Sequence, residues 1–156
     1  MKIHNYTQRY FTTIIFILFT AFLLTTCEKK DPVDDLIEFV WIHSASHPDG
    51  FTLDHTNKTS VTSGIVAAYE ETQNSFGKES LRKVITHSLN HESIVGGWFN
   101  TTDSNYYFDS SIIFSDTSLA EAIAFARENH QLAIYDLTHD STITITYPMR
   151  YLLLQP

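Results

Sequence analysis

The N-terminal segment limits the fold more than any other feature, because it takes part of the chain out of the folded domain. Lys2 and Arg9 precede an apolar run over residues 10–24. A positively charged start followed by a short apolar region is typical of a secretion signal that is removed from the mature protein. A membrane-spanning helix needs roughly 20 apolar residues, whereas this run is shorter and contains threonines. We therefore expect the fold to be formed by the residues that follow the signal.

The apolar run ends in Leu24-Thr25-Thr26-Cys27, an aliphatic residue and two small residues before a cysteine. This tetrapeptide resembles the lipobox of bacterial lipoproteins, although that family usually has Gly, Ala or Ser where this chain has Thr26. The resemblance implies a signal peptide over residues 1–26, a palmitate-type lipid on Cys27, and an anchor in a membrane of the cell envelope, the outer membrane in a Gram-negative bacterium. Cys27 is the only cysteine of the chain, so no disulfide can form within it.

Charge restricts the partners of the mature chain. All 18 acidic residues follow Cys27, whereas Lys2 and Arg9 belong to the signal, so the mature chain is more acidic than the net charge of −8 of the whole sequence. A strongly acidic protein is repelled by nucleic acid and by anionic lipid, which excludes both as main partners. We interpret the acidity as a contribution to solubility rather than as recognition of a basic ligand.

The residues directly after the cysteine predict a tether. Glu28, Lys29, Lys30 and Asp31 are charged, Pro32 disfavours a helix, and little in this segment can be buried. We expect residues 27–35 to form a lipidated tether and residues 36–156 to form one globular domain. The start of this segment also resembles the start of Bacteroidota lipoproteins, in which acidic residues close to the cysteine can act as a surface-export signal.

The first half of the domain predicts three strands and one helix. Apolar and β-branched residues favour strands at residues 36–43, 51–53 and 64–69, with a turn at residues 48–50 and a loop at residues 57–60. A helix over residues 77–91 is predicted, with Asn74 or Ser75 as its cap. Its buried stripe is formed by residues at helical spacing, namely Leu81, Val84, Ile85 and Leu89.

The second half predicts a β-α-β unit. Gly96 and Gly97 indicate a bulge or a close backbone approach, residues 101–105 a hairpin loop, and residues 106–115 a strand. Ser118 and Glu121 form a capping-box pattern for a helix that ends near Asn129 and has an inner face of Leu119, Ala122, Ile123 and Ala126. Further strands are expected at residues 131–137 and 142–147. The predicted fold class is α+β, a single small domain with two helices on one side of a mixed sheet of about five strands.

Several separated stretches resemble a small domain that recurs in uncharacterised bacterial and phage-encoded proteins. They are residues 50–52, 71–77, 95–98, 107–109 and 124–137, and the resemblance covers about two thirds of the mature chain. It implies a shared fold and a shared surface. It implies no catalytic residue.

No catalytic residue, metal or cofactor is predicted. His87 and His91 have the spacing of metal ligands on a helix, but they lie away from the apolar stripe and a third ligand is missing, so we interpret them as solvated surface residues. Asp109 and Asp136 are candidates for paired carboxylates, but we favour structural hydrogen bonding to turns or helix ends as the role of each. The chain has no nucleophile-elbow serine, phosphate-binding loop or dinucleotide fingerprint.

One candidate binding site remains, where a helix start with extra polar groups meets an aromatic group. Free amides at a helix start favour anionic ligands, and Trp98 is a residue type that anchors binding sites. The predicted ligand-binding residues are Glu71, Gln73, Asn74, Ser75, Trp98 and Tyr107, and the alternative is ordinary capping and core packing. The leading hypothesis is a binding module of the envelope for a protein or a small molecule. Its alternatives are a hydrolase with an unrecognised site and an inhibitor or immunity-type protein.

Overall fold

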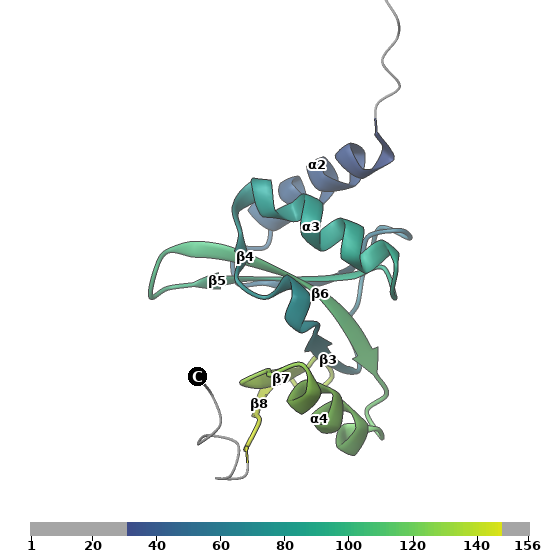
Figure 1. Ribbon diagram of the computed structural model, residues 1–156, viewed down its shortest axis with the longest axis vertical. Coiled ribbons are helices and arrows are strands. Elements are labelled where there is room, and N and C mark those ends of the chain that lie inside the picture. Colours follow the sequence, from purple (N-terminus) through teal and green to yellow (C-terminus); the bar gives the residue numbers. More distant parts are fainter. Residues whose placement is uncertain (1–30, 148–156) are drawn as a thin grey trace, which may run out of the picture. The chain divides into compact units, whose positions relative to one another are not determined.

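The structure is a computed structural model that describes residues 31–147 (Figure 1). Within these residues the chain forms three α-helices, eight strands and one turn of 3-10 helix, η1. In chain order these are α2 (Pro32–Ala45), β1 (Phe51–Asp54), β2 (Thr59–Ser60), β3 (Ile65–Ala68), η1 (Glu70–Thr72), β4 (Ser75–Phe76), α3 (Gly77–Leu89), β5 (Ile94–Asn100), β6 (Asn105–Phe114), α4 (Leu119–Glu128), β7 (Ala133–Asp136) and β8 (Ser141–Thr144). None of the helices described is both long and apolar enough to cross a membrane.

The strands form one sheet in the order β2-β1-β5-β6-β3-β7-β8, and β4 also pairs with β6. The α+β class is confirmed, but the sheet has more strands than expected and a third helix is present. Every described pairing is antiparallel, so the expectation of a mixed sheet is wrong. Helix α4 does connect β6 with β7, but β3 lies between these two strands and runs opposite to both.

Side chains alternate along the long strand β6, so its even-numbered and odd-numbered residues lie on opposite sides of the sheet. Phe108, Ile112 and Phe114 lie on the side that packs against helices. One core cluster joins the first part of this side to α2 and α3, with buried Val40, Leu53, Leu81, Val84, Ile85, Val95 and Phe108. The other joins its last part to α4, with buried Ile65, Ala67, Ala122, Ala126, Ile134 and Ile145. The odd-numbered residues of β6 therefore face away from all three helices.

Residues 36–43 belong to helix α2, so the strand expected there is wrong. The same apolar run also satisfies helical spacing, because Val33, Leu36, Ile37 and Val40 follow one another at intervals of three and one and all contact the core. Pro32 occupies the first turn, where a missing amide costs nothing, and the Asp31 carboxylate accepts a hydrogen bond from the Val33 amide. Residues 31–35, which the sequence analysis assigned to the tether, therefore belong to the described domain.

The two helices that the sequence predicted are present, but neither has the predicted side-chain capping hydrogen bond. Ser75 lies in β4 and pairs with Phe108 of β6. The residue before α3 is Phe76, whose side chain has no polar group that could cap the helix. Ser118 stands before α4, but its side chain makes no capping hydrogen bond. In α3 the fourth buried position is Ser88, and Leu89 is exposed.

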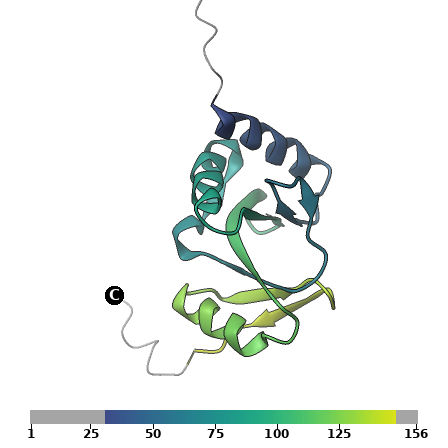
Figure 2. The same cartoon turned by 90° about the vertical axis from the view of Figure 1, so that its right-hand side faces the viewer.

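Strand β3, η1 and β4 run along one edge of β6 as a strand interrupted by a detour (Figure 2). The Tyr69 amide donates to the Ser110 carbonyl. At the detour itself, the fully buried Thr72 hydroxyl accepts from the Ser110 amide over 2.9 Å and replaces a lost ladder bond. The detour places Phe76 beside Tyr107. Strand β5 is regular along its whole pairing with β6 and has no bulge at its two glycines.

Candidate ligand-binding surface

Three aromatic side chains form a row across β4, β6 and β5 on the side of the sheet that faces away from the helices. Trp98 stands opposite Tyr107 in the ladder, with ring centroids 5.1 Å apart and an interplanar angle of 18°. Phe76 stands opposite Tyr107 on its other side, with centroids 5.6 Å apart. Phe76 is 50% exposed and Trp98 is 45% exposed. We call Phe76, Tyr107 and Trp98 the aromatic row.

One face of the Trp98 ring has no neighbour from the next strand. Tyr107 covers one face, and on the β1 side the position opposite Trp98 is Gly50. A Cβ atom placed on Gly50 would lie 3.8 Å from the Trp98 Cα and Cβ atoms, so Gly50 is next to Trp98 but has no side chain to pack against it. Trp98 accordingly stays 45% exposed although Tyr107 stacks on its ring.

Asp109 lies on the same side of β6 as Tyr107, two residues further along the strand. Burial raises the pKa of its carboxyl group to about 6, and a hydrogen bond from the Trp98 side chain opposes part of this rise. The carboxyl group therefore changes its charge near neutral pH. Perturbed pKa values of this kind concentrate at functional sites, although structural carboxyl groups also show them.

A second carboxylate, that of Asp103, lies at the hairpin end of the row. The Tyr107 hydroxyl donates to the Asp103 carboxylate over 2.5 Å, which lowers the pKa of Asp103 and keeps it ionised. No lysine or arginine occurs between Lys83 and Arg127, so the β5–β6 hairpin carries only negative charge. The surface around the row is thus aromatic and acidic.

The predicted site residues divide into two groups. Trp98 and Tyr107 lie together in the aromatic row, and Ser75 is adjacent but buried. Gln73 instead donates to the Asn129 carbonyl at the end of α4 over 2.7 Å, so it has a structural task. Glu71 has an exposed side chain that lies 3.8 Å from the His87 ring.

Asn74 has a φ of 60° at the turn between η1 and β4. Its role there is local backbone geometry, since asparagine tolerates the left-handed region better than most residues. Phe76, which the sequence interpretation left out, takes the place of these loop residues in the site. The only sequence feature that marks Phe76 is its position as an apolar residue directly before the predicted helix.

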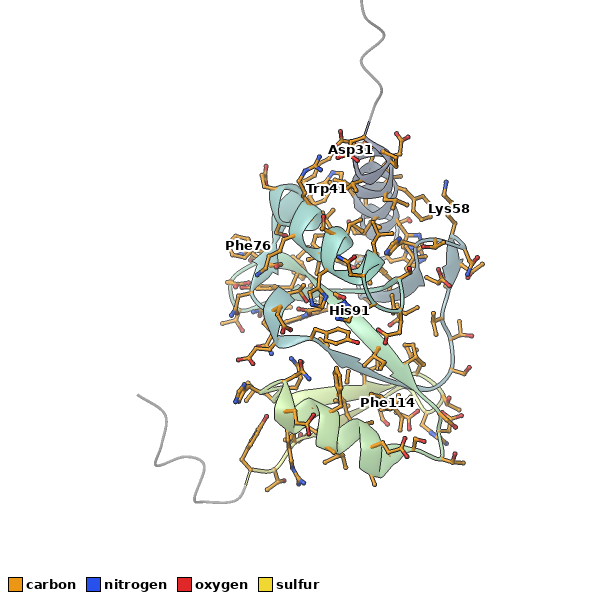
Figure 3. The ribbon with its side chains drawn as sticks, turned by 45° about the vertical axis from the view of Figure 1, so that its right-hand side comes forward. Asp31, Trp41, Lys58, Phe76, His91 and Phe114 are labelled. Atoms are coloured by element: carbon orange, nitrogen blue, oxygen red, sulfur yellow. The ribbon has the colours of Figure 1, made fainter. Side chains whose placement is uncertain are left out.

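His87 and His91 belong to a separate cluster and are not both solvated, which corrects the sequence interpretation. The His87 side chain is 17% exposed, its Nδ1 atom lies 2.9 Å from the Ser110 hydroxyl, and its ring stacks on His91. Tyr69 contacts both rings and donates to Glu92. Figure 3 shows His91 well apart from Phe76.

This cluster does not have the features of a catalytic or metal site. Ser110, His87 and Glu71 stand in the order serine, imidazole, carboxylate, but Ser110 is fully buried and no substrate can reach its hydroxyl. Within residues 31–147, no group of three metal-ligating side chains is present. Burial lowers the pKa of His87, as expected for a structural imidazole.

Asp109 and Asp136 do not form a carboxylate pair. Asp136 stands opposite Ile65, whose side chain is on the helix side, whereas Asp109 is on the other side of the sheet. Asp136 binds His139 and the amides of the following turn. The structural alternative is therefore the correct one for Asp136.

No family model, curated protein or solved structure gave a significant match to this chain. The resemblance to the lipobox and the resemblance to the small recurring domain therefore stay predictions. Cys27 lies outside the described residues.

Proposed function

We propose that the domain is a binding module whose recognition surface is the aromatic row together with Asp109, and that Cys27 anchors it to a membrane of the cell envelope. The observation that carries the first part is the half-exposed Trp98 ring beside a carboxyl group of raised pKa. Tryptophan and tyrosine are the residue types that contribute most to binding energy at interfaces. The anchor rests on the lipobox resemblance.

The energetics of Asp109 support a functional role for this surface. At neutral pH a carboxyl group with a raised pKa costs folding free energy, because the folded state holds its proton more tightly than the unfolded state does. Asparagine would avoid this cost and could still accept the indole hydrogen bond. The aspartate at this position thus lowers stability at neutral pH, which favours a role in recognition over a purely structural role.

A hydrolase is the less supported alternative. The described serine–histidine–glutamate arrangement has a buried serine, and the aromatic row carries no nucleophile beside a base. An inhibitor or immunity-type protein remains compatible with the proposal, because it also acts by binding.

The test compares two neighbouring aromatic residues of β5. Trp98 and Phe99 are 45% and 44% exposed but lie on opposite sides of the strand. The lipidated protein and its Trp98→Ala and Phe99→Ala variants should be cross-linked in intact envelopes, and the captured molecules identified by mass spectrometry. We expect the same partner with the wild type and Phe99→Ala, and its loss with Trp98→Ala. A hot-spot residue contributes about 2 kcal/mol or more, roughly a thirtyfold change in affinity.

Melting temperatures of both variants should be measured alongside. Capture that is equal in both variants, or lost equally in both, would count against the aromatic row as the recognition surface.

The anchor is tested by labelling cells with a palmitate analogue. Cys27→Ser should lose the label, because serine has no thiol for the lipid. Thr26→Ala restores a residue more usual in the lipobox and should retain the label. Persistent labelling of Cys27→Ser would exclude this anchor.

A further inference from the structure

We infer that the aromatic row binds a cationic group, specifically an exposed arginine side chain of a protein partner. This inference rests on the proposed function and names its ligand class. Three independent features of the surface lead to it: a half-exposed indole, carboxylates near it, and the absence of competing cations on the hairpin.

The first feature is the geometry of Trp98. Because Tyr107 stacks on the ring and Gly50 next to it has no side chain to pack against it, Trp98 stays half-exposed and a planar group can stack on it. The π face of tryptophan is the most favourable of the aromatic rings for a cation. An arginine guanidinium is planar, stays charged, and stacks on aromatic faces while its edge donates hydrogen bonds.

The second feature is the position of the acceptors. The Trp98 side chain is close enough to lower the pKa of Asp109, and the two residues lie on the same side of the sheet two positions apart, so this carboxyl group lies near the ring on which the guanidinium would stack. Asp103 accepts a hydrogen bond from the Tyr107 hydroxyl at the hairpin end of the row. A stacked guanidinium would meet carboxylates at its rim, where its N–H groups point.

The third feature is the distribution of cations. Nearby Lys78 is paired with Glu38 on α2, and Arg82 is paired with Asp31 and Asp34. Between Lys83 and Arg127 the sequence has no lysine or arginine, which covers both strands of the hairpin. The surface is therefore complementary to a positive charge supplied from outside the domain.

Ionisation of Asp109 makes the inference specific. A neutral ligand that stacks on Trp98, such as a sugar, gains nothing from a charged Asp109. A cation is attracted to the ionised form and therefore binds more tightly as the pH rises through the pKa of about 6. At one pH unit below that pKa only about one tenth of the carboxyl groups are ionised, so the affinity for a cation should fall about tenfold.

In the test, the full-length protein in detergent is titrated with a short peptide of alternating arginine and glycine, and binding is measured by calorimetry. The matched ligand contains citrulline in place of arginine, which keeps the planar shape but has no charge. We expect the arginine peptide to bind at pH 7 and about tenfold more weakly at pH 5, and the citrulline peptide to bind at least tenfold more weakly at pH 7. Added salt should weaken the binding of the arginine peptide but not that of the citrulline peptide.

Three variants locate the binding. Trp98→Ala should lose at least tenfold in affinity, Asp109→Asn should lose affinity and its dependence on pH between 5 and 7, and Phe99→Ala should bind as the wild type does. Equal binding of the two peptides, no binding of the arginine peptide, or an unchanged affinity of Asp109→Asn would overturn the inference. If partner capture in the envelope still depended on Trp98, the proposed function would survive that result and its ligand would be of another class.

Discussion

Two aromatic rings of the core pack directly against the backbone at Gly97. On the helix side of the sheet, Phe51 and Tyr106 stack with centroids 6.3 Å apart and an interplanar angle of 18°. A Cβ atom on Gly97 would lie 2.4 Å from the Phe51 ring and 2.9 Å from the Tyr106 ring. We expect Gly97→Ala to lower the free energy of unfolding by about 1–3 kcal/mol, the usual cost of overpacking, measured by urea unfolding.

Gly96 supplies the matched control from the same strand. Its nearest contact for an added Cβ is the Ser111 hydroxyl at 3.3 Å, which a small shift can relieve. Gly96→Ala should therefore change the free energy of unfolding by less than about 1 kcal/mol. An equal loss in both variants would show that general strand geometry, not the pair of rings, requires glycine at Gly97.

Single residues were predictable where their role depends on near neighbours in sequence. The glycine pair predicted a close approach or a bulge, and the close approach is correct at Gly97. The tasks of Thr72 and Gln73 were not predictable, because their partners Ser110 and Asn129 are 38 and 56 residues away. Consequently Gln73→Ala should cost stability, because it removes one of the hydrogen bonds that join the η1 segment to the end of α4.

At the scale of elements, helix α2 determines where the domain begins. Asp31 caps the helix, Val33 contacts the core, and Arg82 of α3 pairs with both Asp31 and Asp34. A chain that begins at Leu36 loses all of these contacts. It should unfold with a free energy lower by about 2 kcal/mol or more than a chain that begins at Asp31, mainly through the cap and the Val33 contact.

The two truncated chains should be compared by thermal and urea unfolding, together with Asp31→Ala in the longer chain. The single substitution should account for about 1 kcal/mol, since it removes the cap but keeps the apolar contact. The exposed ion pairs contribute little. Equal stability of the two truncated chains would restore residues 31–35 to the tether.

Elements were predictable from the sequence when they were long enough to show their period. Helices α3 and α4 and strands β1, β3, β6, β7 and β8 were expected near their observed positions, because several residues reveal a spacing of 3.6 or of 2. Strand β5 was not predicted, because its two glycines indicated only a bulge or a close backbone approach. Strands β2 and β4 have two residues each and show no period. Their formation depends on the partner strand, and for the same reason the contact between Phe76 and Tyr107 was not predictable.

At the scale of the whole molecule, buried imidazoles oppose folding in acid. Burial lowers the pKa of His43, His55 and His87 below its ordinary value of 6.5. The His55 side chain is fully buried, and its Nε2 atom donates to the Ser88 hydroxyl, which itself donates to the Ile85 carbonyl. Its Nδ1 atom and the Nε2 atom of His43 are buried without a hydrogen-bond partner in residues 31–147.

These shifts determine how stability depends on pH. Where the folded pKa is lowered, the unfolded state takes up the proton first, so stability is complete above pH 6.5 and is lost as the pH falls through 6.5 toward the lower folded values. Asp109 acts in the opposite direction, because its folded pKa is raised to about 6 and its protonated form favours the folded state. The three imidazoles thus lower the free energy of unfolding as the pH falls from 7 to 5, whereas Asp109 raises it. The contribution of one imidazole to this fall is therefore measured as the difference in pH dependence between a variant and the wild type.

His55→Gln should reduce this fall, because glutamine is close in size, can still donate a hydrogen bond, and takes up no proton. The measurement is urea unfolding of the wild type and the variant at intervals between pH 7 and pH 5. His139→Gln is the control, since the exposed His139 is bound to Asp136 and has a raised pKa. His139 stabilises the folded state at low pH and loses this contribution as the pH rises, so its removal should make the fall steeper. Equal slopes in His55→Gln and the wild type would show that His55 is not held neutral by burial.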